Sequence, residues 1–214
     1  MAALKAGDDD FRSTEIAKAL GGSITGLTIG NGDTAWAAAR GASETTLITD
    51  VMPSADMADV ARSLAAAIRN MEGVDLVLIG DSLWEPAVPV LLGAELGWTS
   101  FAGVTDVDQS ENGFVIRRRT ANIEQQIEIK GPAVLAIAAK SSEETPPGLK
   151  QVLMARKKKV NKVTAADLNA VPGNAVAYTG MALPESTEAE MITGETAEAI
   201  ADRLYTVLRQ EGVL

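Results

Sequence analysis

The stretch VDLVLIG, residues 74–80, decides the fold class of this chain. It is apolar at nearly every position and ends on a glycine, which is typical of a buried strand in a parallel sheet. Helix and strand patterns alternate before it, and this alternation predicts a mostly parallel α/β sheet with helices on both faces. The preceding elements are a helix over 14–20, the strand SITGLTIG (23–30), the helix DTAWAAARG (33–41), the strand TTLITD (45–50) and a helix over 56–70. We expect SITGLTIG and VDLVLIG to lie in one sheet.

The pattern changes after residue 98. PVLLGAELGW (89–98) predicts a helix that begins at a proline, and alternating polarity then predicts an antiparallel excursion over 103–129 with a turn at Asn112–Gly113. PAVLAIAA (132–139) predicts a return to a buried strand. The remainder is rich in proline and glycine and then helical over 196–211. We therefore expect a domain over 1–170 and a carboxyl-terminal arm over 171–214.

The composition restricts the chemistry that the chain can perform. It has 214 residues, no cysteine, no histidine and a net charge of −10. Thiolate and imidazole chemistry and the usual zinc ligand sets are excluded, so no metal site is expected. The acidity argues against nucleic acid as a partner, because phosphate binding needs a broad basic surface. No window reaches the roughly 20 apolar residues of a membrane span, and no apolar signal region is seen, so we expect a cytoplasmic protein.

Two turns are candidate ligand sites, because ligands of open α/β sheets bind where strands end and helices begin. They are IGNGDT (29–34) and IGDSLWEP (79–86), which contain small and polar residues at Gly30 and Gly80. Neither is a GxGxxG fingerprint or a P-loop. Glycines that only permit tight strand-to-helix turns remain the simpler interpretation.

A basic run stands out in this acidic chain. GLKQVLMARKKKV (148–160) contains three consecutive lysines. Such a run is most often the solvated face of a helix or the end of a loop. It is too isolated to indicate a nucleic-acid surface.

Several landmarks together resemble the beta subunit of electron transfer flavoproteins, and most closely the subgroup tied to carnitine metabolism and nitrogen fixation. They are RGASETTLITD (40–50), GVDLVLIGDS (73–82), RRR (117–119) and IKGPAVLAIAAKSSEETPPGLKQVLMARKKKVNKVTAADL (129–168). The resemblance implies a Rossmann-like fold of the adenine nucleotide alpha hydrolase type. It also implies a heterodimer in which an alpha subunit holds most of an FAD, while the beta subunit covers the flavin, buries an AMP and has no catalytic residue. The carboxyl-terminal arm would then pack on the alpha subunit.

The resemblance assigns partner recognition to the segment before the basic run. In the family, an exposed leucine on a loop docks into the partner, a flavin-dependent dehydrogenase such as an acyl-CoA dehydrogenase, and Leu149 stands at that position. We expect Leu149 to be exposed on a loop that Pro146 and Pro147 keep extended. An apolar anchor beside charge suits a transient, electrostatically steered interface. The same segment supplies three further candidate residues, Lys157, Lys158 and Lys159.

The resemblance also implies a nucleotide pocket, which the chain supports weakly. Family members begin with an apolar strand beside SITGLTIG that is missing here, so we expect either a mis-assigned start or a shortened amino terminus, and an exposed sheet edge. At the start of the phosphate-binding helix, Ala87 replaces the family's polar residue and Pro89 replaces its glycine, and proline donates no N–H. Asp81 and Glu85 would repel a phosphate. The pocket residues that the resemblance implies are Ile29, Gly30, Gly80, Asp81 and Ser82.

Other interpretations remain open. A free-standing adenine-nucleotide-binding module, a sensor in the manner of universal stress proteins, would need an intact phosphate turn. A degenerate relative that keeps its partner interface and has lost AMP would act as a scaffold. The arginines 117–119 match a basic signature of the family, but ion pairs with the acidic surface explain them equally well.

Overall fold

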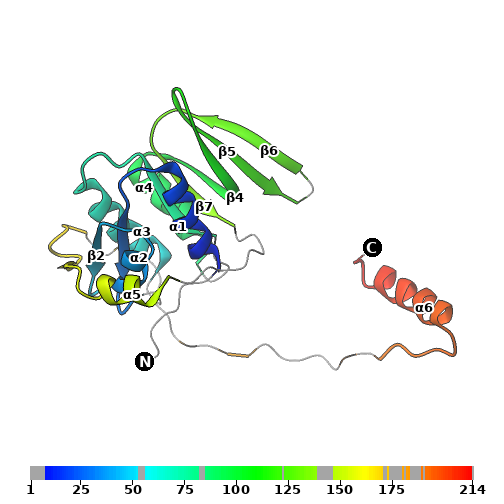
Figure 1. Cartoon of the computed structure of the whole chain (residues 1–214). Coiled ribbons are helices and arrows are strands. Elements are labelled where there is room, and N and C mark those ends of the chain that lie inside the picture. Colours follow the sequence, from blue (N-terminus) through cyan, green and yellow to red (C-terminus); the bar gives the residue numbers. More distant parts are fainter. Residues whose placement is uncertain are drawn as a thin grey trace. The chain divides into compact units, whose positions relative to one another are not determined.

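The computed structural model describes residues 8–52, 56–81, 85–121, 123–138, 147–170, 173, 180, 182–183, 189 and 191–213. It divides the chain into two units, 1–178 and 179–214. The first unit has helices packed around β-strands (Figure 1) and confirms the predicted α/β class. Its elements are α1 (Asp8–Leu20), β1 (Thr25–Ile29), α2 (Thr34–Ala39), β2 (Glu44–Ile48), α3 (Met57–Arg69), β3 (Leu76–Gly80), α4 (Val88–Leu96), β4 (Thr99–Ser110), β5 (Gly113–Thr120), β6 (Ile123–Ile129), β7 (Ala133–Ile137), α5 (Leu149–Ala155) and β8 (Val160–Val163).

Local sequence signals set the helix ends. The side chains of Asp33 and Asp56 accept hydrogen bonds from the N–H groups of Ala35 and Ala58, which caps α2 and α3. Gly97 ends α4 in the left-handed conformation, with φ of 70°. These helices therefore begin and end close to where the sequence predicts.

The strands form two sheets. In the first, β1, β2 and β8 are parallel in the order β1-β2-β8. In the second, the order is β3-β7-β4-β5-β6, with β3, β7 and β4 parallel and β4, β5 and β6 antiparallel. The antiparallel excursion is confirmed, and its first strand begins earlier than predicted, at Thr99. The prediction that β1 and β3 share one sheet is wrong.

One hydrophobic core nevertheless joins the two sheets. Leu27 and Ile29 of β1 and Val77 and Ile79 of β3 pack against the same cluster, which includes Ile48 of β2 and the apolar face of α3. A second cluster lies around α1, β4 and β7 and takes in Leu76 and Leu78 of β3. β3 therefore has apolar contacts on both faces, as its sequence predicts.

β1 and β3 are edge strands of two different sheets. Among the described strands, β1 pairs with β2 alone and β3 with β7 alone, so each leaves one edge without a partner. An edge strand is less buried than a central one. β7 is buried at every position, whereas the side chains of residues 76–79 in β3 are only half-buried. Within the described residues, the outer edges of β1 and β3 both lack a partner strand.

We predict that hydrogen exchange distinguishes β3 from β7. In a parallel ladder, the N–H groups of successive residues point alternately to the two neighbouring strands. β7 has a partner on both sides, whereas alternate N–H groups of β3 face its open edge. NMR-detected exchange should therefore alternate between fast and slow along Leu76–Gly80 and be uniformly slow along Ala133–Ile137. Uniform protection of β3 would show that another segment covers this edge.

The second unit contains α6 (Ala197–Gln210), which confirms the helix predicted over 196–211. The Thr196 hydroxyl accepts a hydrogen bond from the Ala199 N–H, at 3.2 Å, and caps the helix. Ile200, Leu204 and Tyr205 form an apolar stripe at helical spacing, and all three are exposed. Among the described residues, no helix of either unit is long and apolar enough to cross a membrane.

Candidate functional site

Backbone geometry explains the glycines in the turn after β1. Gly30 has φ of 59°, a left-handed conformation that favours glycine, and its N–H donates to the Ile48 carbonyl at 2.8 Å. A Cβ on Gly32 would lie 2.2 Å from the Thr28 hydroxyl oxygen. Ile29 packs against the shared core. The simpler interpretation of this turn, glycines that permit a tight bend, is therefore sufficient.

Asp81, in the turn after β3, makes a structural hydrogen bond. The Asp81 carboxylate accepts a hydrogen bond from the Gly103 N–H at 2.8 Å, and its own N–H donates to the Ile137 carbonyl at 2.9 Å. Gly103 has φ of 69° and lies where the register between β4 and β7 shifts. Asp81 therefore holds the bend of β4 against the end of β3. Gly80 is buried beside it, and Ser82 lies outside the described residues.

The start of α4 does not fit a nucleotide phosphate. The Val88 N–H already donates to the Glu85 carbonyl at 3.1 Å, and Pro89 has no N–H to offer. Burial raises the pKa of the Glu85 carboxyl above its ordinary value, and a carboxylate here would repel a phosphate. No side chain caps this helix. The structure thus agrees with the sequence departures and argues against AMP at α4.

We predict that Asp81→Ala destabilises the fold by about 1.5 kcal/mol, because the Gly103 N–H loses a charged acceptor. Asp81→Asn keeps an acceptor oxygen and should cost less. Urea unfolding of the two variants measures the difference. If Asp81 served only as a ligand, both variants would unfold like the unchanged chain.

Leu149 is exposed as predicted, but its local structure differs. Its side chain is 76% exposed, and it is the first residue of helix α5 rather than part of an extended loop. The Gly148 N–H donates to the Gln151 side-chain oxygen at 2.9 Å, and Gly148 is the N-cap directly before the helix. Gly148 is extended and Leu149 is helical, so the prediction that Leu149 lies on an extended loop is wrong. Pro146 lies outside the described residues.

The lysine run separates into two roles. The Lys158 ammonium donates to the Ala42 carbonyl at 2.7 Å and to the Ala38 carbonyl at 3.5 Å. These carbonyls lie at the carboxyl-terminal end of α2, where a cation offsets the helix dipole. Lys157 and Lys159 are exposed. Lys158 is therefore a structural lysine, and Lys157 and Lys159 are available to a partner.

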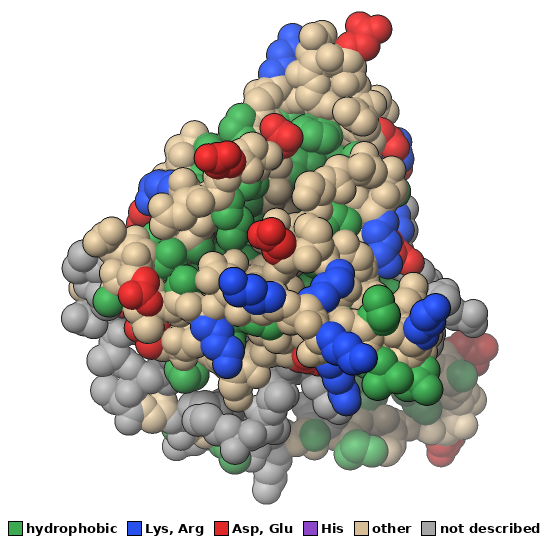
Figure 2. All heavy atoms as spheres, turned by 60° about the vertical axis from the view of Figure 1, so that its left-hand side comes forward, with side chains coloured by type: hydrophobic (Ala, Val, Ile, Leu, Met, Phe, Trp, Pro, Cys, Tyr) green, Lys and Arg blue, Asp and Glu red, His purple; other side chains and the backbone are tan. Residues whose placement is uncertain are grey.

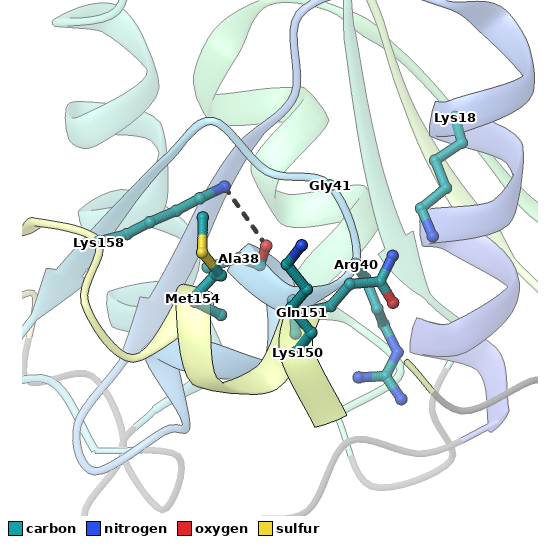
Figure 3. A pocket seen from close by; sticks show the side chains of 10 residues that line it. Lys18, Ala38, Arg40, Gly41, Lys150, Gln151, Met154 and Lys158 are labelled. Carbon is teal, nitrogen blue, oxygen red and sulfur yellow. Dashed lines mark hydrogen bonds between the residues drawn. The ribbon is translucent and has the colours of Figure 1, made fainter. Parts of the chain in front are cut away.

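A basic cavity of about 400 Å³ lies between α1, α2 and α5 (Figure 3). None of the described residues that line it is acidic. Figure 2 shows Lys and Arg side chains gathered over the lower part of one face, with hydrophobic side chains beside them. The basic lining residues are Lys18, Arg40, Lys150 and Lys158.

The cavity lies at the amino-terminal edge of the first sheet. Lys18 is in the last turn of α1 before β1, Arg40 follows α2 before β2, and Lys158 precedes β8. These three strands are parallel, so their amino-terminal ends share one edge. Ligands of α/β sheets bind at the opposite edge, so the cavity is separate from the turns at Gly30 and Gly80.

Sequence reasoning missed three of these residues. Lys18, Arg40 and Lys150 are far apart in the chain, and only the fold brings them together. Arg40 is held by stacking, since its guanidinium lies 4.8 Å from the Phe11 ring centre and 4.2 Å from that of Trp36. The i, i+4 spacing of Lys150 and Met154 is the one local signal, because it places both on one face of α5, whereas Lys158 lies beyond the helix end.

Two of the three arginines at 117–119 interact with side chains of the second sheet. Arg117 forms ion pairs with Asp106 at 3.7 Å and Asp108 at 2.9 Å. The Arg118 guanidinium lies 5.8 Å from the Phe101 ring centre. The ion-pair interpretation of this signature is therefore confirmed for Arg117.

Comparison with known proteins gives one family and a consistent set of relatives. The family model described as the electron transfer flavoprotein domain matches residues 10–168. The electron transfer flavoprotein subunit beta of Mycobacterium bovis is 29% identical over 167 residues, which cover 74% of this chain and 62% of that protein. Proteins of the same description from two strains of Mycobacterium tuberculosis match to the same extent. The chain thus matches less than two thirds of the length of these relatives.

Proposed function

The chain belongs to the electron transfer flavoprotein family, and on this premise we propose that it is the beta-type subunit of a heterodimeric electron transfer flavoprotein. It would pair with an alpha subunit and dock a flavin-dependent dehydrogenase, such as an acyl-CoA dehydrogenase. It would carry electrons without being an enzyme itself. The observation that carries the proposal is the family match over residues 10–168, which spans both turns and α5.

The exposed face of α5 supports the docking part of the proposal. Leu149, Leu153 and Met154 are 76%, 51% and 60% exposed, although large apolar side chains are usually buried. Exposed apolar groups beside charge are typical of transient interfaces. Leu149, Lys157 and Lys159 are the proposed recognition residues, and Lys158 serves the fold.

We propose FAD as the cofactor, held mainly by the alpha subunit and covered by this chain. The flavin supplies the redox chemistry, while the protein supplies shape and burial. AMP is left out, because the first turn of α4 does not fit a phosphate. The arm over 171–214 is proposed to pack on the alpha subunit through Ile200, Leu204 and Tyr205 of α6, which are exposed and apolar. The cytoplasmic location remains a prediction.

Membership of the subgroup tied to carnitine metabolism and nitrogen fixation is part of the proposal. Genes for either process beside this gene would support it. Genes for a fatty acid dehydrogenase in that place would favour a general electron carrier instead.

The poor phosphate turn favours one second candidate, a scaffold that keeps the partner interface without a redox role. Co-expression with an alpha subunit from the same genome separates the candidates. A yellow heterodimer with about one FAD per complex supports the proposal, and a colourless complex without nucleotide supports the scaffold. A colourless monomer that retains AMP or ATP would contradict both and support a nucleotide-binding module.

A further inference from the structure

The basic cavity between α1, α2 and α5 is unusual in a chain whose net charge is −10. Two of its four basic residues are occupied, since Lys158 bonds the end of α2 and Arg40 stacks on Phe11 and Trp36. Within the described part of the chain, neither Lys18 nor Lys150 forms an ion pair. These two ammonium groups come from different helices, as Figure 3 shows, and both are exposed. Neither ammonium group therefore has a carboxylate of the described residues within ion-pair distance.

An apolar stripe borders this cavity. Leu149 and Leu153 are four residues apart and share one face of α5, while Lys150 and Met154 share the adjacent face that lines the cavity. Met154 is 60% exposed, so apolar surface continues from the stripe into the cavity. The combined surface offers an apolar contact and a cationic contact side by side.

We propose that this cavity receives an Asp or Glu side chain of the electron-transfer partner, next to the partner surface that covers Leu149 and Leu153. This inference rests on the proposed function and adds the partner's chemistry to it. A protein segment with a carboxylate beside an apolar residue matches both parts of the surface. A small free anion would match the cationic part alone.

Electrostatics explains why such a site helps a carrier. Positive charge concentrated in one cavity steers a partner that would otherwise be indifferent to, or repelled by, an acidic protein. Each exposed ion pair adds a modest affinity, so the complex still dissociates quickly. The apolar stripe supplies affinity, and the cavity selects the orientation.

The first experiment uses the full chain and three probes at one ionic strength. They are a capped peptide of alternating leucine and glutamate, the same peptide with glutamine for glutamate, and inorganic phosphate. NMR titration should show the acidic peptide shifting the amide signals of Gly41, Lys150 and Gln151, with the glutamine peptide much weaker. Lys18→Glu/Lys150→Glu should weaken the acidic peptide about tenfold, as expected for reversing two exposed charges.

A matched variant controls for net charge. Arg119→Glu/Lys130→Glu changes the charge equally, and neither residue lines the cavity. It should bind the acidic peptide like the unchanged chain. Equal loss in both variants, equal binding of the two peptides, or phosphate binding at the same residues with the affinity of the acidic peptide would overturn the proposal.

A second experiment separates this inference from the proposed function. The heterodimer carrying Lys18→Glu/Lys150→Glu should keep its FAD and its reduction by dithionite, while kcat/KM with the dehydrogenase falls and loses part of its salt dependence. A colourless unchanged heterodimer would refute the electron-transfer role and leave the peptide result to decide on the cavity. If the variant heterodimer is yellow and its rate keeps the unchanged salt dependence, the proposed role of the cavity is refuted and the electron-transfer role is not.

Discussion

Replacing Leu149 with alanine is expected to lower kcat/KM for electron transfer from the partner dehydrogenase about 5- to 150-fold. The reason is that an apolar anchor desolvated in a partner pocket contributes about 1–3 kcal/mol, and each 1.36 kcal/mol is tenfold in rate. The 76% exposure of Leu149 leaves it little role in the fold. The flavin spectrum and the stability of the heterodimer should therefore not change. The measurement is the rate at subsaturating dehydrogenase.

Ile123→Ala provides the matched control. Ile123 is 62% exposed and begins β6, on a different element from α5. Its removal should leave the rate unaltered. Equal rates for Leu149→Ala and the unchanged protein would withdraw Leu149 from recognition.

Replacing Ile48 with alanine should destabilise the domain by about 2–5 kcal/mol, through lost burial and the cavity left behind. Ile48 is fully buried in the cluster that joins β1 and β3, so the loss should affect both sheets together. Urea unfolding followed by tryptophan fluorescence and by far-ultraviolet circular dichroism should show one coincident transition at lower urea.

Ile48→Val removes less volume and should cost about 0.5–1.5 kcal/mol. The ratio of the two costs tests the packing. Separate transitions for the two probes, or an alanine variant no less stable than the valine variant, would contradict a single core shared by the sheets.

Local signals in the sequence predict most of the fold. Asp33 and Asp56 begin the ranges predicted for two helices, and both cap those helices with their side chains. The alternation around VDLVLIG likewise predicts the parallel α/β order. These features depend on residues close together in the chain.

Strand pairing was predicted less well, because it depends on distant partners. An apolar stretch such as VDLVLIG indicates two buried faces, but it carries no information on how many neighbours complete its ladder. β3 has one neighbour and remains half-buried, whereas the similar AVLAI of β7 has two and is buried. β8 was not predicted at all, since VNKV is short and half polar.

The candidate site shows the same limit. Leu149 was identified through family resemblance, and its exposure could be predicted, but the Gln151 contact that begins α5 at this residue could not. Asp81 had the chemistry of a ligand, yet Gly103, 22 residues later, makes it a structural residue. The basic cavity required three separate segments to meet, which no local pattern reveals.

Anaerobic reduction of the purified heterodimer tests the central claim most directly. The complex of this chain with its alpha subunit would be mixed with a catalytic amount of dehydrogenase and its substrate, and flavin absorbance would be followed. We predict bleaching of the bound FAD at a rate that rises with dehydrogenase concentration and vanishes when the substrate is omitted. A complex that contains FAD but is not reduced by any flavin-dependent dehydrogenase of the same cell, while dithionite reduces it, would contradict the electron-transfer role.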